Sequence, residues 1–267
     1  MPNPQAAAAQ AADLFWSAWQ HGAALEALPP ACRPHTRAEG YAVQALLEPR
    51  SAKPVAGWKI AATSTAGQKH INVSGPLAGR LLAERVRPDG ATFSMAGNRM
   101  AVAEAEFVFR LARDLPPRAA PYTQDEAMGA VDDLYLGIEV PNSRFLDFVG
   151  AGEAQLIADN ACAHEFMLGP RVEAPWRELD LAAHRVHATV TGTSRSYERD
   201  GIGANVLGDP RIAMTWLANE LSQNGVTLGK GQIVTTGTCV VPLEIAAGDV
   251  VTADFGALGR ATARFTD

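Results

Sequence analysis

Residues 102–109 place two carboxylates, Glu104 and Glu106, inside an otherwise apolar run. Side chains of a β-strand alternate between faces, so these two acids point the same way if the run is a strand. A third acid, Glu139, lies in a second apolar run over 136–140. Three carboxylates that meet in an apolar setting repel one another and lose hydration, and a divalent cation removes that cost. Oxygen ligands suit a hard ion, so the pattern predicts a Mg²⁺ or Mn²⁺ site; the alternative is three solvated acids on exposed strand faces.

Composition narrows the classes of protein to consider. The chain has 267 residues, 47% of them hydrophobic, which is enough for one large domain or a main domain with a small helical extension. Only 19% are charged, the net charge is −6, and no dense Lys/Arg block offers the basic patch that nucleic acids require. No apolar run approaches the ~20 residues of a membrane span, and residues 1–5 lack signal-peptide features. Three widely spaced cysteines fit a reducing cytoplasm.

The first 50 residues carry helical signals. Apolar residues recur at helical spacing over 5–21, and Thr36 with Glu39 forms a capping box for a second helix that ends before Pro49. Further helices are expected at 64–71, 124–132 and 210–224. Short β-like runs follow at 55–61, 101–110, 134–140, 185–191, 232–236, 240–245, 249–254 and 260–265. The sequence predicts an α+β fold with a helical segment over 1–50 packed on a β-rich core over 51–267, or one single domain containing both.

Several blocks along nearly the whole chain match a known pattern when taken in order. They are Gly57-Trp58-Lys59-Ile60 with Thr63-Ser64, Gly79-Arg80-Leu81, Glu104-Ala105-Glu106, Gly137-Ile138-Glu139, Ala158-Asp159-Asn160-Ala161, Val206-Leu207-Gly208-Asp209-Pro210, and residues 248–256 with Leu258-Gly259. Each block is weak alone, but their order and spacing are specific. The chain resembles the hydratase/decarboxylase branch of the fumarylacetoacetate hydrolase superfamily, which contains 2-keto-4-pentenoate hydratases and 4-oxalocrotonate decarboxylases of aromatic catabolism.

The resemblance implies a metal-dependent enzyme with a β-rich, rolled core of mixed sheets, assembled as a homo-oligomer and able to associate with a partner enzyme of its pathway. It also implies that Glu104, Glu106 and Glu139 are the metal ligands. Three positions depart from the pattern: Leu77 replaces the acid common in hydratases, Cys162 replaces a serine, and Thr236-Gly237-Thr238 replaces a Ser-Gly turn. The resemblance also implies that the decarboxylases of this branch have an apolar residue at the position of Leu77.

The chemistry of such a site can be derived from its residues. A small 2-keto acid offers a carboxylate oxygen and a keto oxygen that can chelate one cation, and the cation then stabilises the dienolate through which both hydration and decarboxylation pass. Lys59 is the candidate for a second catalytic group, because an amine in an apolar strand loses hydration and its pKa should fall. The alternatives are a lysine that extends to solvent or one that pairs with a metal-binding acid.

A second set of residues is predicted to contact the substrate: Leu77, Arg80, Asn160, Cys162, Gly237 and Thr238. Arg80 and Arg144 suit a carboxylate because guanidinium binds it bidentately, although a surface salt bridge is favoured for Arg144. Asp159 either builds a turn or orients a water, and Cys162 is expected to be a small buried thiol. Gly237 and Thr238 could offer backbone N–H groups to a carboxylate or form an ordinary hairpin.

We therefore expect a metal-dependent lyase that hydrates a 2-hydroxy-2,4-dienoate or unsaturated 2-keto acid, because residues 253–256 resemble the hydratases. Decarboxylation of a 4-oxalocrotonate-like diacid is the alternative that Leu77 favours. Hydrolysis of an acylpyruvate C–C bond is less favoured, because those hydrolases usually have Asp where Glu139 stands. A non-catalytic homologue that binds a keto acid or stabilises a partner enzyme is the rival from another class, which need not keep all of Lys59 and the three acids.

Overall fold

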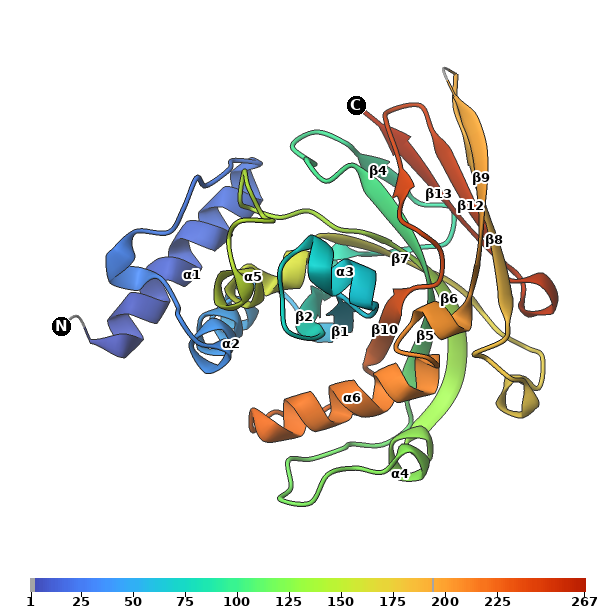
Figure 1. Cartoon of the computed structure of the whole chain (residues 1–267), viewed down its shortest axis with the longest axis horizontal. Helices are drawn as coiled ribbons and strands as arrows, with labels where there is room; N and C mark the ends of the chain where they lie inside the picture. Colours follow the sequence, from blue (N-terminus) through green and yellow to red (C-terminus); the bar gives the residue numbers. More distant parts are fainter. Residues whose placement is uncertain (1–2, 194) are drawn as a thin grey trace.

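Two curled, mixed sheets form the core of the computed structural model, which describes residues 3–193 and 195–267 (Figure 1). The larger sheet has the strand order β2-β1-β10-β5-β6-β7-β3, with β11 paired to β5, and the smaller one has the order β4-β13-β12-β8-β9. The strands are β1 (Val55–Ala61), β2 (Leu77–Leu82), β3 (Val86–Pro88), β4 (Thr92–Ser94), β5 (Val102–Leu111), β6 (Val131–Val140), β7 (Glu165–Arg171), β8 (Arg185–Thr191), β9 (Ser196–Ile202), β10 (Ile233–Thr238), β11 (Leu243–Glu244), β12 (Val250–Asp254) and β13 (Arg260–Thr266). The predicted α+β fold with mixed sheets is confirmed.

The centre of the larger sheet is the antiparallel pair β5 and β6, ten residues each. Both strands are rich in β-branched and aromatic residues, which favour pleated, well-packed surfaces. Phe107 and Phe109 on β5 and Leu134 and Leu136 on β6 share one face of the sheet and are fully buried in the main hydrophobic core. A central pair this well packed gives any side chain on it a precise position.

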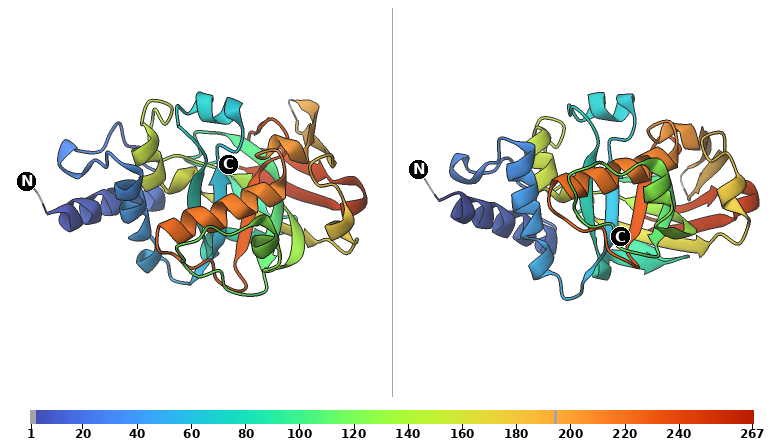
Figure 2. Two further views of the ribbon diagram at one scale, coloured as in Figure 1. Left: turned by 60° about the horizontal axis from the view of Figure 1, so that its bottom comes forward. Right: turned by 90° about the horizontal axis from the view of Figure 1, so that it is seen from below.

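Helices α1 (Pro4–His21) and α2 (Arg37–Ala45) lie at the opposite end of the molecule from the smaller sheet (Figures 1 and 2). The predicted capping box at Thr36 and Glu39 is present, and α1 ends at Gly22, whose φ of 63° is left-handed. Phe15 of α1 packs edge-on against Phe145, which follows β6. The helical segment therefore shares apolar contacts with the β-rich part, and a domain boundary near residue 50 stays a prediction.

The remaining helices are α3 (Thr65–His70), α4 (Gln124–Met128), α5 (Glu153–Ala158) and α6 (Pro210–Gln223). The predicted helix over 124–132 is four residues too long, because residues 131–132 already belong to β6. Local sequence patterns did not predict β2, β3, β4, β7, β9 or α5. Strand β2 is buried along its whole length, so its residues show no alternation, and β9 is an edge strand whose residues are mostly polar. No helix among the described residues is long and apolar enough to cross a membrane.

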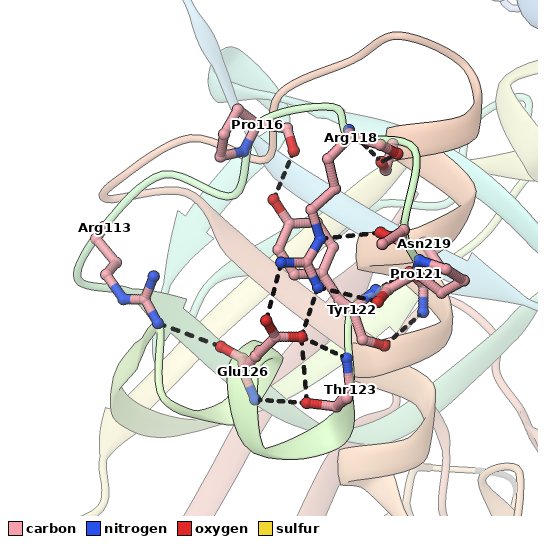
Figure 3. Close-up of polar contacts among 10 residues, drawn as sticks. Arg113, Pro116, Arg118, Pro121, Tyr122, Thr123, Glu126 and Asn219 are labelled. Carbon is pink, nitrogen blue, oxygen red and sulfur yellow. Dashed lines mark hydrogen bonds and ion pairs between the residues drawn. The ribbon is translucent and has the colours of Figure 1, made fainter.

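A polar cluster fastens the long connection between β5 and β6 to α4 and α6 (Figure 3). The guanidinium of Arg118 contacts both carboxylate oxygens of Glu126 and lies 3.7 Å from the ring centroid of Tyr122. Glu126 also caps α4, because its carboxylate accepts the backbone N–H of Thr123 at 2.9 Å. The bond to Arg118, followed by the bond from Thr123, lowers the pKa of Glu126 to about 2.

This depressed pKa predicts a pH-dependent contribution to stability. A carboxyl with a lower pKa in the folded state stabilises the fold above its unfolded-state pKa, and that contribution is lost as the pH falls. We expect the wild-type protein to lose this part of its stability between about pH 4.5 and pH 2. In Glu126→Gln the corresponding loss should be absent. Urea unfolding of both proteins at several pH values measures the difference, and parallel stability curves would contradict the prediction.

Candidate metal and substrate site

Three glutamates converge on one point of the larger sheet. The antiparallel register pairs Glu104 of β5 with Glu139 of β6, and Glu106 lies two residues further along β5 on the same face. One carboxylate oxygen from each lies within 4.8 Å of the others. Among the described residues, Oε1 of Glu106 and Oε2 of Glu139 are buried with no hydrogen-bond partner, and Oε1 of Glu139 has only an ion pair with Lys59. Buried carboxylate oxygens with no donor are costly, so this all-oxygen set fits a hard divalent cation.

The ionisation of these acids reflects the same cost. Burial, then the neighbouring Glu139, raises the pKa of Glu104 to about 7, while Lys59 opposes the shift. Burial, followed by Glu139 and Glu104, raises the pKa of Glu106 well above its usual value. Burial also raises the pKa of Glu139, against the pull of Lys59. The three acids therefore need more positive charge than Lys59 supplies before all of them ionise together.

Strand β10 holds Glu106 in place. The side-chain hydroxyl of Thr235 and the backbone N–H of Gly237, the latter at 2.7 Å, both donate to Oε2 of Glu106. Gly237 has a φ of 107° at an irregularity in the pairing of β10 with β5, a backbone conformation that L side chains rarely adopt. The predicted N–H donor at Gly237 thus binds the side chain of Glu106 and not a substrate carboxylate. Because Oε2 is engaged, Oε1 is the oxygen left free to bind an ion.

Lys59 of β1 lies beside the acids and is 2% exposed. Its Nζ is 3.1 Å from Oε1 of Glu139 and donates to the carbonyl oxygen of Ala161 at 3.0 Å. Burial by itself lowers the pKa of Lys59, but Glu139 and then Glu104 outweigh burial and raise it. The expected fall in pKa is therefore wrong for the metal-free protein, because the sequence did not show how close the acids lie. The amine carries its proton here.

The carbonyl group of Ala161, which Lys59 contacts, belongs to a strained turn. Asn160, Ala161 and Cys162 have φ values of 55°, 51° and 60°, so three successive residues other than glycine adopt the left-handed region. The side-chain amide of Asn160 stabilises the turn: it accepts the backbone N–H of Arg80 at 2.7 Å and donates to the Arg80 carbonyl at 2.9 Å. Asn160 therefore acts on the backbone of β2, next to Gly79, which pairs with Lys59.

Loss of the Asn160 amide should destabilise the protein strongly. In Asn160→Ala, two buried backbone groups of Arg80 lose their partners, and each unsatisfied group costs about 1–3 kcal/mol. We expect the free energy of unfolding in urea to fall by about 2–4 kcal/mol. A decrease below about 0.5 kcal/mol, the range of ordinary surface substitutions, would show that the turn holds its conformation without the amide.

Two arginines predicted to bind a carboxylate have other partners. Arg80 reaches Glu48 at 3.2 Å and stacks on Trp58, with its guanidinium 4.6 Å from the ring centroid. Arg144 is 2% exposed and bonds to Asp159 through its side chain, so the favoured surface salt bridge is wrong. Asp159 compensates this buried guanidinium and also accepts the Ser143 hydroxyl at 2.6 Å. Neither arginine lines the cavity described next.

A cavity of about 560 Å³ opens beside the acids. Of the predicted site residues, Lys59, Leu77, Glu104, Cys162 and Thr238 line it, whereas Glu106, Glu139, Arg80, Asn160 and Gly237 do not. Burial, then Asp159, raises the pKa of Cys162 to about 12, which fits a neutral thiol. The lining residues that were not predicted from the sequence include Met100, Phe148 and Asn205. They lie in loops or at strand ends, and no local pattern shows that these segments are close together. Thr235, which donates to Glu106, was not predicted either, although its position two residues before Gly237 was a usable signal.

The acids, the lysine and the curled sheet can now be compared with known proteins. Residues 50–266 match the family model described as fumarylacetoacetate (FAA) hydrolase C-terminal. The chain belongs to the FAA hydrolase family. The match covers the whole β-rich part, including every residue of the three-acid site, so the predicted resemblance is confirmed.

Individual relatives narrow the comparison. A 2-keto-4-pentenoate hydratase of Burkholderia vietnamiensis is 32% identical over 230 residues, 85% of each chain. A second one, from Paraburkholderia phymatum, is 32% identical over 243 residues, 90% of each chain. Among solved structures, 4-oxalocrotonate decarboxylase from Pseudomonas putida G7, complexed with magnesium and adipate, superimposes with a TM-score of 0.85 at 25% identity and 97% coverage of each chain. Both predicted reaction classes, hydratase and decarboxylase, are thus present among the relatives of this FAA hydrolase family member.

Proposed function

We propose that this chain is a divalent-metal-dependent lyase that adds water to a 2-hydroxy-2,4-dienoate, the enol of an unsaturated 2-keto acid. The observation that carries the proposal is the convergence of Glu104, Glu106 and Glu139 within 4.8 Å at a cavity, beside the buried ammonium of Lys59. A purely structural homologue has no need for three adjacent carboxylates, two of them buried and incompletely bonded, which destabilise the fold unless an ion compensates them. The curated relatives described above are hydratases.

Mg²⁺ or Mn²⁺, bound by the three glutamates, would supply a Lewis acid that stabilises negative charge on the 2-oxygen of the substrate. The protein residues supply the rest. Thr235 and Gly237 hold Oε2 of Glu106, so that Oε1 keeps its position when the substrate enters. Lys59 carries a proton at Nζ beside the site, and we propose that it moves this proton to the substrate as the dienol is converted to the keto form.

Analysis of the reaction products tests this proposal directly. The magnesium-loaded protein is incubated with 2-hydroxypenta-2,4-dienoate and, separately, with 4-oxalocrotonate, and the products are identified by mass spectrometry. Hydration adds the mass of one water to the dienoate, whereas decarboxylation removes the mass of carbon dioxide from the diacid. Absence of turnover of both compounds, with metal bound, would contradict a lyase of either class.

Decarboxylation is the second candidate, and one observation favours it: Leu77, at the position where hydratases of this branch commonly have an acid, is fully buried and lines the cavity. An apolar wall favours the loss of a charged carboxylate as carbon dioxide. The similarity to the decarboxylase structure is consistent with this alternative.

The substitution Leu77→Asp separates the two candidates. If the apolar side chain limits hydration, a carboxylate at this position provides a base for water, and we expect the hydration rate to rise about tenfold or more, within the range of general base catalysis. Leu77→Asn is the matched control, because it has the same shape without the base and should give no gain. An equal effect of both variants, or no gain in Leu77→Asp, would count against a diverting role of Leu77.

We also propose that the protein is cytoplasmic and that it assembles as a homo-oligomer. We further propose that it associates with an enzyme of the same pathway. The location is supported by three buried cysteines that form no disulfide. Size-exclusion chromatography with light scattering tests the assembly, and a monomer at the assay concentration would contradict it.

A further inference from the structure

The residues that line the cavity are more exposed to solvent at its mouth than at its base. At the base, Lys59 and Leu77 are at most 2% exposed, and Glu104 is half-buried. At the mouth, Val241 is 65% exposed and His70 is also exposed. A substrate that chelates an ion at the three acids must therefore extend its far end from the base toward the mouth.

The walls along this path are predominantly apolar and come from segments outside the acid-bearing parts of β5 and β6. The larger apolar lining residues include Ile71 beyond α3, Leu77 of β2, Met100 and Val102 around the start of β5, Phe148 after β6, and Val240 and Val241 after β10. Apolar walls contribute binding energy in proportion to the apolar substrate surface that they cover. Each added methylene that they enclose tightens binding about fourfold, from about 0.8 kcal/mol per methylene.

Positive charge along the same path is scarce. Of the described residues that line the cavity, Lys59 is the single Lys or Arg, and Glu139 and the Ala161 carbonyl already engage it. Two of the polar lining groups are also occupied: Asn205 donates to the Cys239 carbonyl and the Thr238 hydroxyl to the Val240 carbonyl, each at 2.7 Å. A second carboxylate on the substrate would be enclosed without a cation, which is strongly unfavourable.

One lining residue could moderate this cost. The imidazole of His70, on α3, lies with its ring centroid 6.1 Å from that of Phe148, in an edge-on arrangement. Because His70 is exposed at the mouth, a carboxylate next to it would remain in contact with water and gain little from the pairing. His70 is therefore not a preformed binding site for a second carboxylate, and its role is tested below by substitution.

We infer that the cavity selects a 2-keto or 2-hydroxydienoic monoacid whose far end is an uncharged alkyl group, and that it discriminates against diacids. This inference rests on the proposed function, because it assumes chelation at the three acids. It also assigns hydration as the main reaction, since a substrate without a second carboxylate has no carbon dioxide to lose from its far end.

Saturated 2-oxo acids test the inference, because they keep the chelating group but cannot react by hydration. Isothermal titration calorimetry of the magnesium-loaded protein is carried out with pyruvate, 2-oxobutanoate, 2-oxopentanoate, 2-oxohexanoate and the diacid 2-oxoadipate. We expect affinity to rise by up to about fourfold per added carbon, and 2-oxoadipate to bind at least about tenfold more weakly than the six-carbon monoacid. The same titrations without metal should give no binding.

The outcomes separate a failure of the proposed function from a failure of the selectivity for monoacids. If no 2-oxo acid binds the metal-loaded protein, the proposed function itself fails. If the monoacids bind with magnesium but 2-oxoadipate binds as tightly or more tightly, only the selection of monoacids is overturned. Tight binding of 2-oxoadipate that disappears in His70→Gln would overturn it in a specific way, by showing that the imidazole recognises the second carboxylate.

A substitution at the mouth provides the converse test. Val241→Lys adds a cation at an exposed position, where a change of side chain should leave the fold intact. We expect it to tighten 2-oxoadipate binding by up to about fivefold relative to 2-oxohexanoate, because an ion pair at an exposed position contributes about 1 kcal/mol at most. Val241→Gln, which adds length without charge, should leave the ratio unchanged. A ratio that the lysine does not alter would mean that the second carboxylate lies elsewhere, and the inference would be wrong.

Discussion

Glu106→Gln is expected to weaken magnesium binding at least about 100-fold and to reduce turnover about 1000-fold, which corresponds to roughly 4 kcal/mol of lost transition-state stabilisation. Oε1 of Glu106 is the oxygen that β10 leaves free for the proposed ion, and the substitution removes its charge. The amide cannot restore the site by turning, because Thr235 and Gly237 both donate toward the Oε2 position and require an acceptor there.

The same substitution should stabilise the metal-free protein. Burial and the two neighbouring acids raise the pKa of Glu106 well above its usual value, so its carboxylate is unfavourable in the absence of a cation. A neutral amide removes that repulsion. Thermal unfolding with and without magnesium measures both effects: we expect a higher melting temperature for the metal-free variant and no increase when magnesium is added.

Glu244→Gln is the matched control for Glu106→Gln, because its side chain is 58% exposed and lies outside the site. It should bind magnesium and turn over substrate like the wild type. Turnover by Glu106→Gln within tenfold of the wild type would defeat the assignment of this residue as a metal ligand.

Lys59→Met is expected to reduce turnover about 1000-fold, within the range of general acid–base catalysis. Methionine keeps the length and apolar stem of the side chain, so the substitution removes the ammonium and little else. Magnesium should bind more tightly to this variant, because a positive charge 3.1 Å from Oε1 of Glu139 is removed. Loss of activity with a gain in metal affinity would separate a role in proton transfer from a role in holding the metal site together.

Lys59→Arg distinguishes the charge of Lys59 from its proton. Arginine keeps the positive charge but does not release a proton at ordinary pH, so it should support substrate binding without restoring turnover. Isothermal titration with 2-oxohexanoate and an assay of turnover measure the two properties separately. Recovery of turnover in Lys59→Arg would mean that the charge alone is sufficient, and the proposed proton transfer would be wrong.

Local patterns predicted much of this molecule because they depend on neighbouring residues alone. The alternation around Glu104 and Glu106 indicated an apolar strand with two acids on one face, and β5 has this structure. The capping box at Thr36 with Glu39 likewise needs only a few residues of one segment. Strand β2 escaped detection because burial on both faces removes the alternation by which a strand is recognised.

Buried charge was harder to predict. Arg144 was assigned to the surface because arginine is seldom buried without a partner, and its partner Asp159 is 15 residues away. The direction of the pKa shift of Lys59 was predicted from burial alone, whereas the distance to Glu139 decides its sign. Both errors have the same physical cause: the energy of a buried charge depends on partners that approach through the fold.

Strand geometry repeats every two residues and needs no partner, so the amino-acid pattern alone places two carboxylates on one face of an apolar strand. The folded structure is needed to bring Glu139 opposite Glu104, because that pairing depends on the register between β5 and β6. It also decided that Lys59 stands beside them and that a left-handed turn at Asn160 supports it. Register and loop closure join residues far apart in the chain, and their energies come from contacts that exist only in the folded protein.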